Sequence, residues 1–129
     1  MKIKTALYCS LGLIAIFIYS GCYYDKESIV YPNANDCDTT DIKLSTDLNA
    51  IMSTSCYSCH STANAPAFGG NYNLQDYTTI KNAALDGRLL SSITQDGVLA
   101  APMPQSGTKL SDCSINKFRA WINAGVPNN

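Results

Sequence analysis

Two cysteines and a histidine lie within five consecutive residues, Cys56-Tyr57-Ser58-Cys59-His60, and His60 is the one histidine in the sequence. In the pattern C-x-x-C-H, two thiols about one helical turn apart can form thioether bonds with the two vinyl groups of a haem. The imidazole that follows can then bind the haem iron. The pentapeptide therefore predicts one covalent haem c, attached through Cys56 and Cys59, with His60 as an axial ligand.

Two other kinds of site share the C-x-x-C spacing. Structural zinc needs four ligands, but the sequence contains no second C-x-x-C, and a fourth ligand would have to come from another cysteine or a carboxylate at no characteristic spacing. A thioredoxin-like dithiol needs a β-α-β context, but no run of β-branched residues precedes Cys56. We therefore favour haem, with zinc and a redox dithiol as the alternatives.

A haem iron bound by His60 has a second axial position, and the chain offers methionine as the remaining strong ligand. Met52 lies four residues before Cys56 on the same predicted helix, so its side chain cannot easily reach the opposite haem face. Met103 is distant in sequence, and prolines on both sides, within 101–104, restrict its backbone. We expect Met103 to be the second axial ligand; a methionine that merely covers apolar surface is the alternative.

The amino terminus has the pattern of an export signal. Two lysines precede an apolar stretch, 6–19, which is short for a transmembrane helix but suits a signal peptide. The sequence Tyr-Ser-Gly-Cys at 19–22 resembles a bacterial lipobox, although its tyrosine replaces the usual aliphatic residue. We expect a lipoprotein signal peptide at 1–21, lipidation of Cys22, and a lipid-anchored protein at the bacterial cell envelope, facing the periplasm or the exterior. An uncleaved anchor and cleavage elsewhere are the alternatives.

Two cysteines, Cys37 and Cys113, have no role in the signal, the lipid anchor or the haem motif. An exported protein meets an oxidising compartment, so an even remainder of cysteines predicts a disulfide between them. Closing so long a loop would stabilise the fold by about 4 kcal/mol in the chain-entropy treatment. The alternative is a pair of free thiols.

The net charge and the local composition indicate which partners the protein does not bind and where its domain begins. The formal net charge is −1 and becomes more negative when the lysines of the signal are removed, which argues against nucleic-acid binding. Residues 22–40 are acidic, contain Pro32 and several asparagines, and lack helical periodicity, so they predict a flexible tether. Residues 41–129 then form the functional domain.

Within 41–129 the apolar spacing predicts short helices and no strand, which makes the fold class all-α. Expected elements are a helix capped at Ser45 or Thr46 that runs into Cys56, a loop over 61–73, a helix over 78–86 stopped by Gly87, a short helix over 89–94, and a last helix that starts at Ser111 and stops before Gly125 and Pro127.

Three features together resemble the small class I c-type cytochromes, most closely the lipoprotein cytochromes of Bacteroidetes-type bacteria. They are the C-x-x-C-H pentapeptide, the pair Met103-Pro104, and the amphipathic segment 119–125, and the resemblance spans 41–129. It implies an all-α domain wrapped around a covalent haem, with His60 and Met103 as axial ligands. The cysteine pair at 37 and 113 is a departure from most members.

The resemblance implies electron transfer without substrate turnover, and elementary chemistry agrees. Two strong ligands leave the iron no vacant position, and the soft methionine sulfur favours ferrous iron. So small a domain buries little apolar area, so the haem would act as its core. We therefore expect a monomeric, non-enzymatic monohaem cytochrome that carries single electrons between redox partner proteins. The alternatives are a haem subunit serving a dehydrogenase- or peroxidase-type enzyme, and a haem-based gas or redox sensor.

Overall fold

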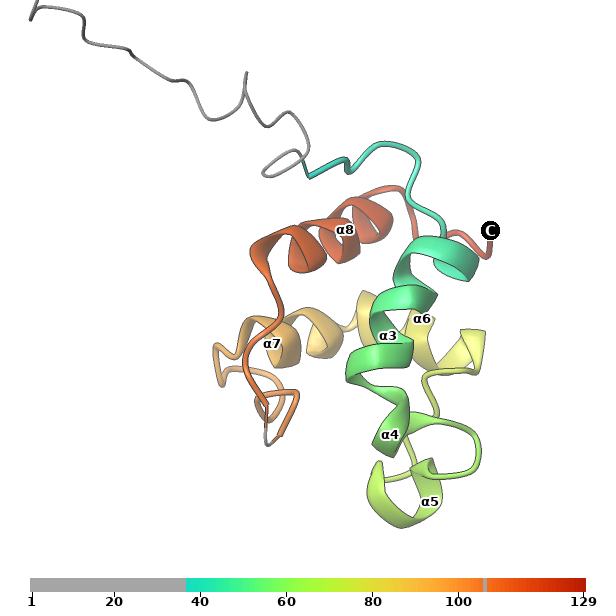
Figure 1. Cartoon of the computed structure of the whole chain (residues 1–129), viewed down its shortest axis with the longest axis vertical. Coiled ribbons are helices and arrows are strands. Elements are labelled where there is room, and N and C mark those ends of the chain that lie inside the picture. Colours follow the sequence, from blue (N-terminus) through green and yellow to red (C-terminus); the bar gives the residue numbers. More distant parts are fainter. Residues whose placement is uncertain (1–36, 106) are drawn as a thin grey trace, which may run out of the picture. The chain divides into compact units, whose positions relative to one another are not determined.

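The computed structural model describes residues 37–105 and 107–129, and this part of the chain is all helix and connecting loop, with no strand (Figure 1). The predicted all-α class is therefore confirmed for these residues. The elements are η1 (Leu44–Leu48, a π-helical turn), α3 (Asn49–Ser55), α4 (Tyr57–His60), α5 (Ala65–Phe68), α6 (Tyr77–Leu85), α7 (Arg88–Thr94) and α8 (Asp112–Asn123).

The predicted signal peptide, the lipidation site Cys22 and residues 22–36 of the predicted tether lie outside the described residues. Within the part that the structure describes, no helix has the length and apolar character needed to cross a membrane.

The first helical segment begins at Leu44, which is earlier than predicted. The predicted cap at Ser45 or Thr46 is therefore wrong. The residue preceding the first turn is Lys43, whose backbone N–H donates to the Asp47 carboxylate at 3.0 Å. The Leu44 N–H donates to the side-chain oxygen of Asn129 at 2.9 Å. A residue from the other end of the domain therefore satisfies a donor that a local cap would otherwise have to satisfy.

The segment 61–73 is not the uninterrupted loop that its composition predicts, because it contains the one-turn helix α5. Pro66 lies in the first turn of α5, where a missing N–H costs no helical hydrogen bond. The turn ends at Gly69, and a Cβ at that position would lie 2.6 Å from the carbonyl oxygen of Cys59. Only glycine allows α5 to approach the pentapeptide this closely.

The other three helices agree with the sequence prediction to within one residue at their starts, because each has a strong local signal. Asp76 caps α6 by accepting from the Thr79 N–H at 2.8 Å. Gly87, with φ of 82°, separates α6 from α7. Ser111 caps α8 by accepting from the Ser114 N–H at 3.1 Å.

The core forms where α8 packs against η1 and α7, and buried side chains of α3 and α6 contribute to it. Its largest fully buried side chains are Trp121, Phe118, Leu48, Met52 and Ile80. Burial of each such side chain is worth about 1.5–3 kcal/mol. The Trp121 indole N–H donates to the Pro127 carbonyl at 2.8 Å, so its one polar atom is satisfied inside the domain.

A disulfide joins Cys37 to Cys113, as the cysteine count predicts. Their Cα atoms are 5.4 Å apart although 76 positions separate them in sequence. The bond ties the segment before η1 to the first turn of α8.

Candidate functional site

The pentapeptide 56–60 occupies a single helical turn at the end of α3. The backbone leaves helical geometry at Cys56, where φ is −126°, and resumes it in α4. The Cys56 N–H still donates to the Met52 carbonyl at 2.8 Å, and the His60 N–H donates to the Cys56 carbonyl at 2.9 Å. The turn that carries both thiols and the imidazole is thus held by backbone hydrogen bonds on each side of the break.

The two thiols of the motif differ in their surroundings. Cys56 is half-buried against the core, and this burial raises the pKa of its thiol to about 11, whereas Cys59 is exposed. Neither cysteine belongs to a disulfide. Both sulfur atoms therefore remain chemically available for thioether bonds.

The imidazole of His60 is held in one tautomer. Its Nδ1 lies 3.0 Å from the backbone carbonyl oxygen of Tyr72, and because a carbonyl oxygen only accepts, Nδ1 must carry the proton. In the neutral imidazole, Nε2 then carries the lone pair, as it does in a metal-binding histidine. The His60 carbonyl accepts from the Leu74 N–H at 2.8 Å, so the two segments are joined at a second point.

Tyr72 is itself held by a residue of α7. The Arg88 guanidinium donates to the Tyr72 phenol oxygen at 2.6 Å and forms an ion pair with Asp86 at 3.0 Å. These contacts link α7 to Tyr72, the residue whose backbone carbonyl orients His60. Sequence reasoning missed Tyr72 and Arg88, because a backbone carbonyl leaves no sequence signal; the pair Gly69-Gly70 was the one visible hint of a tight approach.

The predicted second ligand lies on a different element. The Met103 N–H donates to the Ser92 carbonyl of α7 at 2.9 Å, and the Gln95 amide donates to the Met103 carbonyl at 3.3 Å. The Met103 side chain is half-buried, and the peptide bond to Pro104 is cis. The structure thus brings the cysteines and His60 together on one turn and holds Met103 on a separate loop.

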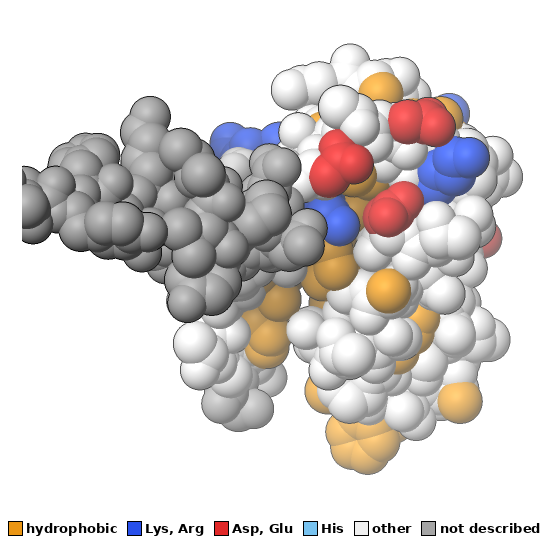
Figure 2. All heavy atoms as spheres, turned by 45° about the horizontal axis from the view of Figure 1, so that its top comes forward, with side chains coloured by type: hydrophobic (Ala, Val, Ile, Leu, Met, Phe, Trp, Pro, Cys, Tyr) orange, Lys and Arg blue, Asp and Glu red, His pale blue; other side chains and the backbone are white. Residues whose placement is uncertain are grey.

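The turn with the pentapeptide and the loop with Met103 lie at the same end of the described part. In Figure 1, α3, α4 and α5 descend along one side, and α7 with the loop that follows it lies opposite. Figure 2 shows the surface at this end hollowed between two lobes, with hydrophobic side chains visible in the walls. The hollow opens between the two elements that carry the predicted ligands.

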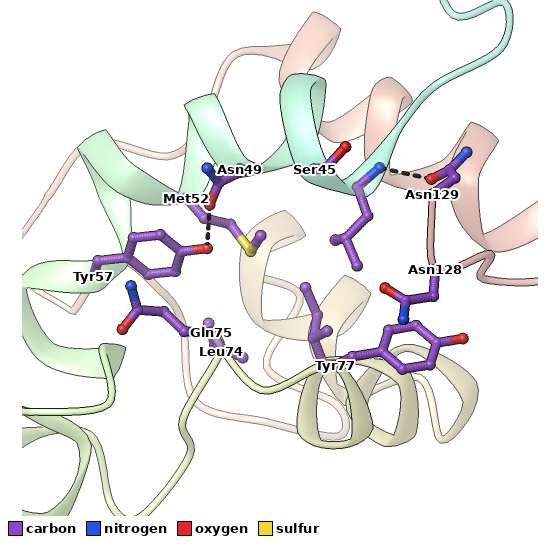
Figure 3. A pocket seen from close by; sticks show the side chains of 11 residues that line it. Ser45, Asn49, Met52, Tyr57, Leu74, Gln75, Tyr77, Asn128 and Asn129 are labelled. Carbon is purple, nitrogen blue, oxygen red and sulfur yellow. Dashed lines mark hydrogen bonds between the residues drawn. The ribbon is translucent and has the colours of Figure 1, made fainter.

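Met52 does not compete for the same role, because its side chain is 2% exposed in the core. Its sulfur points into a cavity of about 190 Å³ behind the pentapeptide (Figure 3). In that cavity the Tyr57 hydroxyl donates to the Asn49 amide oxygen at 2.7 Å. Met52 is therefore a packing residue, as its place on the first helix predicts.

A second cavity, of about 330 Å³, lies between α7 and α8, where Leu90, Leu99 and Arg119 contribute to its wall. Cys56, Cys59, His60 and Met103 line neither cavity. The candidate site is accordingly the hollow between the two lobes and neither of these two cavities.

The donor atoms of the site can be compared with what a prosthetic group requires. Within 37–105 and 107–129, no group of three or more His, Cys, Asp or Glu side chains is placed to hold a metal ion. Two unpaired thiols on one turn, followed by an imidazole with a free Nε2, match what a covalently bound haem requires.

Comparisons of the sequence and the fold with known proteins found no matching protein family, characterised protein or solved structure.

Proposed function

We propose that this chain is a lipid-anchored monohaem c-type cytochrome that carries single electrons between redox partner proteins at the bacterial cell envelope. The observation that carries the proposal is the hydrogen bond between His60 Nδ1 and the Tyr72 carbonyl, within a C-x-x-C-H turn whose thiols are unpaired. That bond orients the imidazole and leaves Nε2 as a ligand. The anchor would be Cys22.

Each residue of the site has a defined task in this proposal. Cys56 and Cys59 would hold the porphyrin through thioether bonds, and His60 would bind the iron through Nε2. The Tyr72 carbonyl keeps the His60 imidazole in its orientation. When bound, the haem supplies an iron centre that alternates between the ferrous and ferric states. Met103 would be the second ligand of the iron, from the loop that is fastened to α7.

Electron transfer is favoured over catalysis because His60 and Met103 together would leave the iron no open position. Oxygen or peroxide chemistry needs an open position on iron, and the sequence has no second histidine to assist it. Methionine sulfur stabilises the ferrous state and raises the reduction potential. Unchanged coordination in both oxidation states suits rapid one-electron exchange.

The test is expression of the full chain together with a cytochrome c maturation system, followed by a pyridine haemochrome assay on denatured protein. We expect one covalent haem per chain, loss of covalent attachment in the double variant Cys56→Ala/Cys59→Ala, and unchanged attachment in Cys37→Ala/Cys113→Ala as the matched control. A chain that carries no covalent haem contradicts the proposal.

Carbon monoxide distinguishes the carrier from a gas sensor. A ferrous iron held by His60 and Met103 should bind carbon monoxide slowly and weakly, because the gas must displace a ligand. Rapid and tight binding to the unmodified protein would favour a sensor instead.

A further inference from the structure

Charged residues are missing from the two segments that carry the proposed ligands. Residues 49–75, which include the pentapeptide, and residues 97–108, which include Met103, contain no Lys, Arg, Asp or Glu. Charged residues lie close to the ends of both segments, at Asp47, Asp76, Asp96 and Lys109. We call the exposed part of these two segments the uncharged face.

The structure brings the two segments to the same end of the domain. Both border the hollow described above, and the charged side chains visible in Figure 2 gather on the upper part of the surface, away from the two lobes. Two charged groups of the described residues contact these segments. Arg88 donates to the Tyr72 phenol and is paired with Asp86 at 3.0 Å, so it adds no net charge there. Asp96, just before the second segment, accepts from the Val98 N–H at 2.9 Å.

The position of Cys59 connects this face to electron transfer. Cys59 is exposed, so a group attached to its sulfur reaches the surface at α4. Next to it, Gly69 packs against the Cys59 carbonyl and the His60 ring, and the neighbouring Phe68 is 72% exposed. The part of these two segments that a haem leaves exposed carries no Lys, Arg, Asp or Glu, because neither segment contains any.

We propose that the uncharged face is the docking surface for electron exchange, and that it fits a redox protein whose own contact face is likewise uncharged and partly apolar. This inference rests on the function proposed above. A charged partner surface would lose its hydration against this face without gaining an opposite charge. Binding would instead depend on apolar contact over a small area, as in short-lived redox complexes.

Electron self-exchange tests the proposal directly, because a second copy of the chain presents a partner face of the stated chemistry. The exchange rate between the ferrous and ferric holoprotein is measured by NMR line broadening at low ionic strength. We expect Phe68→Lys and Phe68→Asp each to slow exchange at least about tenfold, because like charges placed opposite each other cost more than 1.4 kcal/mol. Phe68→Leu should leave the rate within about twofold of the unmodified protein.

Asn116→Lys is the matched control, because Asn116 is exposed on α8 and the substitution changes the net charge by the same amount as Phe68→Lys. We expect its self-exchange rate to stay within about twofold of the unmodified protein. If the Phe68 variants fail to fold, as judged by circular dichroism, Ala67→Lys and Ala67→Asp replace them, since Ala67 is exposed on the same turn.

The outcomes separate the two proposals. A haem-bearing protein in which Phe68→Lys exchanges as fast as Asn116→Lys overturns the docking surface and leaves the proposed function intact. The docking surface is also overturned if one sign of charge at Phe68 slows exchange and the other accelerates it, since this would indicate a charged contact face. A chain without covalent haem overturns both proposals.

Discussion

The two halves of the proposed iron site are held in different ways. The turn that carries His60 is fixed by backbone hydrogen bonds to α3, by the bond to the Tyr72 carbonyl, and by the close approach of Gly69. The loop that carries Met103 is fastened to α7 through the Ser92 carbonyl and Gln95. His60 is therefore held by contacts from several segments, whereas the Met103 backbone is held by two hydrogen bonds to one element and the residue after it.

The largest expected effect is on stability when a methyl group is added on the rigid side. Gly69→Ala should lower the free energy of unfolding by about 3 kcal/mol, because the new Cβ meets the backbone oxygen of Cys59 at 2.6 Å and that oxygen cannot move aside. Gly107→Ala is the matched substitution on the Met103 loop, where the Cβ meets Pro104 at 3.1 Å. We expect it to cost less than about 1 kcal/mol in the same urea titration. Equal losses would show that the two regions are equally rigid.

The second effect concerns the side chain of Met103. Met103→Ala should lower the free energy of unfolding by only about 1 kcal/mol, because the side chain is half-buried. The ferrous variant should bind carbon monoxide rapidly, because the gas no longer displaces a ligand. Met52→Ala serves as the comparison: Met52 is fully buried, so the variant should lose about 2–5 kcal/mol and keep its slow gas binding. If Met52→Ala alone bound the gas rapidly, Met52 and not Met103 would be the second ligand.

Removing the Arg88 side chain, which connects α7 to Tyr72 on the His60 side, should have a smaller effect. Arg88→Ala removes the hydrogen bond to the Tyr72 phenol and an ion pair exposed to solvent, so the loss should be about 0.5 kcal/mol or less. The informative measurement is amide hydrogen exchange at Leu74, whose N–H donates to the His60 carbonyl. Faster exchange there would show that α7 helps to hold the His60 side. Tyr72→Phe, which keeps the backbone carbonyl, should give the same result.

The smallest effect depends on pH and acts on the start of the Met103 loop. Hydrogen bonds lower the pKa of Asp96, chiefly the bond from the Ser91 hydroxyl and then the bond from the Val98 N–H at 2.9 Å. A lowered pKa in the folded state means that this stabilisation is present above the unfolded pKa of about 3.9 and is lost as the pH falls through the folded value. Amide exchange at Val98, corrected for its intrinsic pH dependence, should therefore accelerate at the acid end of a titration. Asp96→Asn should remove this pH dependence.

Much of the helix pattern could be predicted from the sequence because its signals are local. Asp76, Gly87 and Ser111 are caps or stops that act on their own neighbours, so α6, α7 and α8 start within one residue of the predicted positions. The start of η1 could not be predicted in this way, because Asn129 supplies its partner from the far end of the domain. The one-turn helix α5 was not predicted, because its segment is rich in Ser, Asn, Ala and Gly, a composition that is typical of loops.

The features of the candidate site likewise fall into those set by local sequence and those set by tertiary contacts. The sequence by itself determined that two thiols and an imidazole share one helical turn, because covalent spacing along a helix sets their separation. It also determined that the segments around the proposed ligands carry no charge. Only the tertiary structure decided that the Tyr72 carbonyl fixes the tautomer of His60, that Gly69 allows this approach, and that Met103 is fastened to α7. Those contacts join backbone atoms of segments that are distant in sequence, and any residue type can supply a backbone carbonyl or N–H except for the N–H of proline.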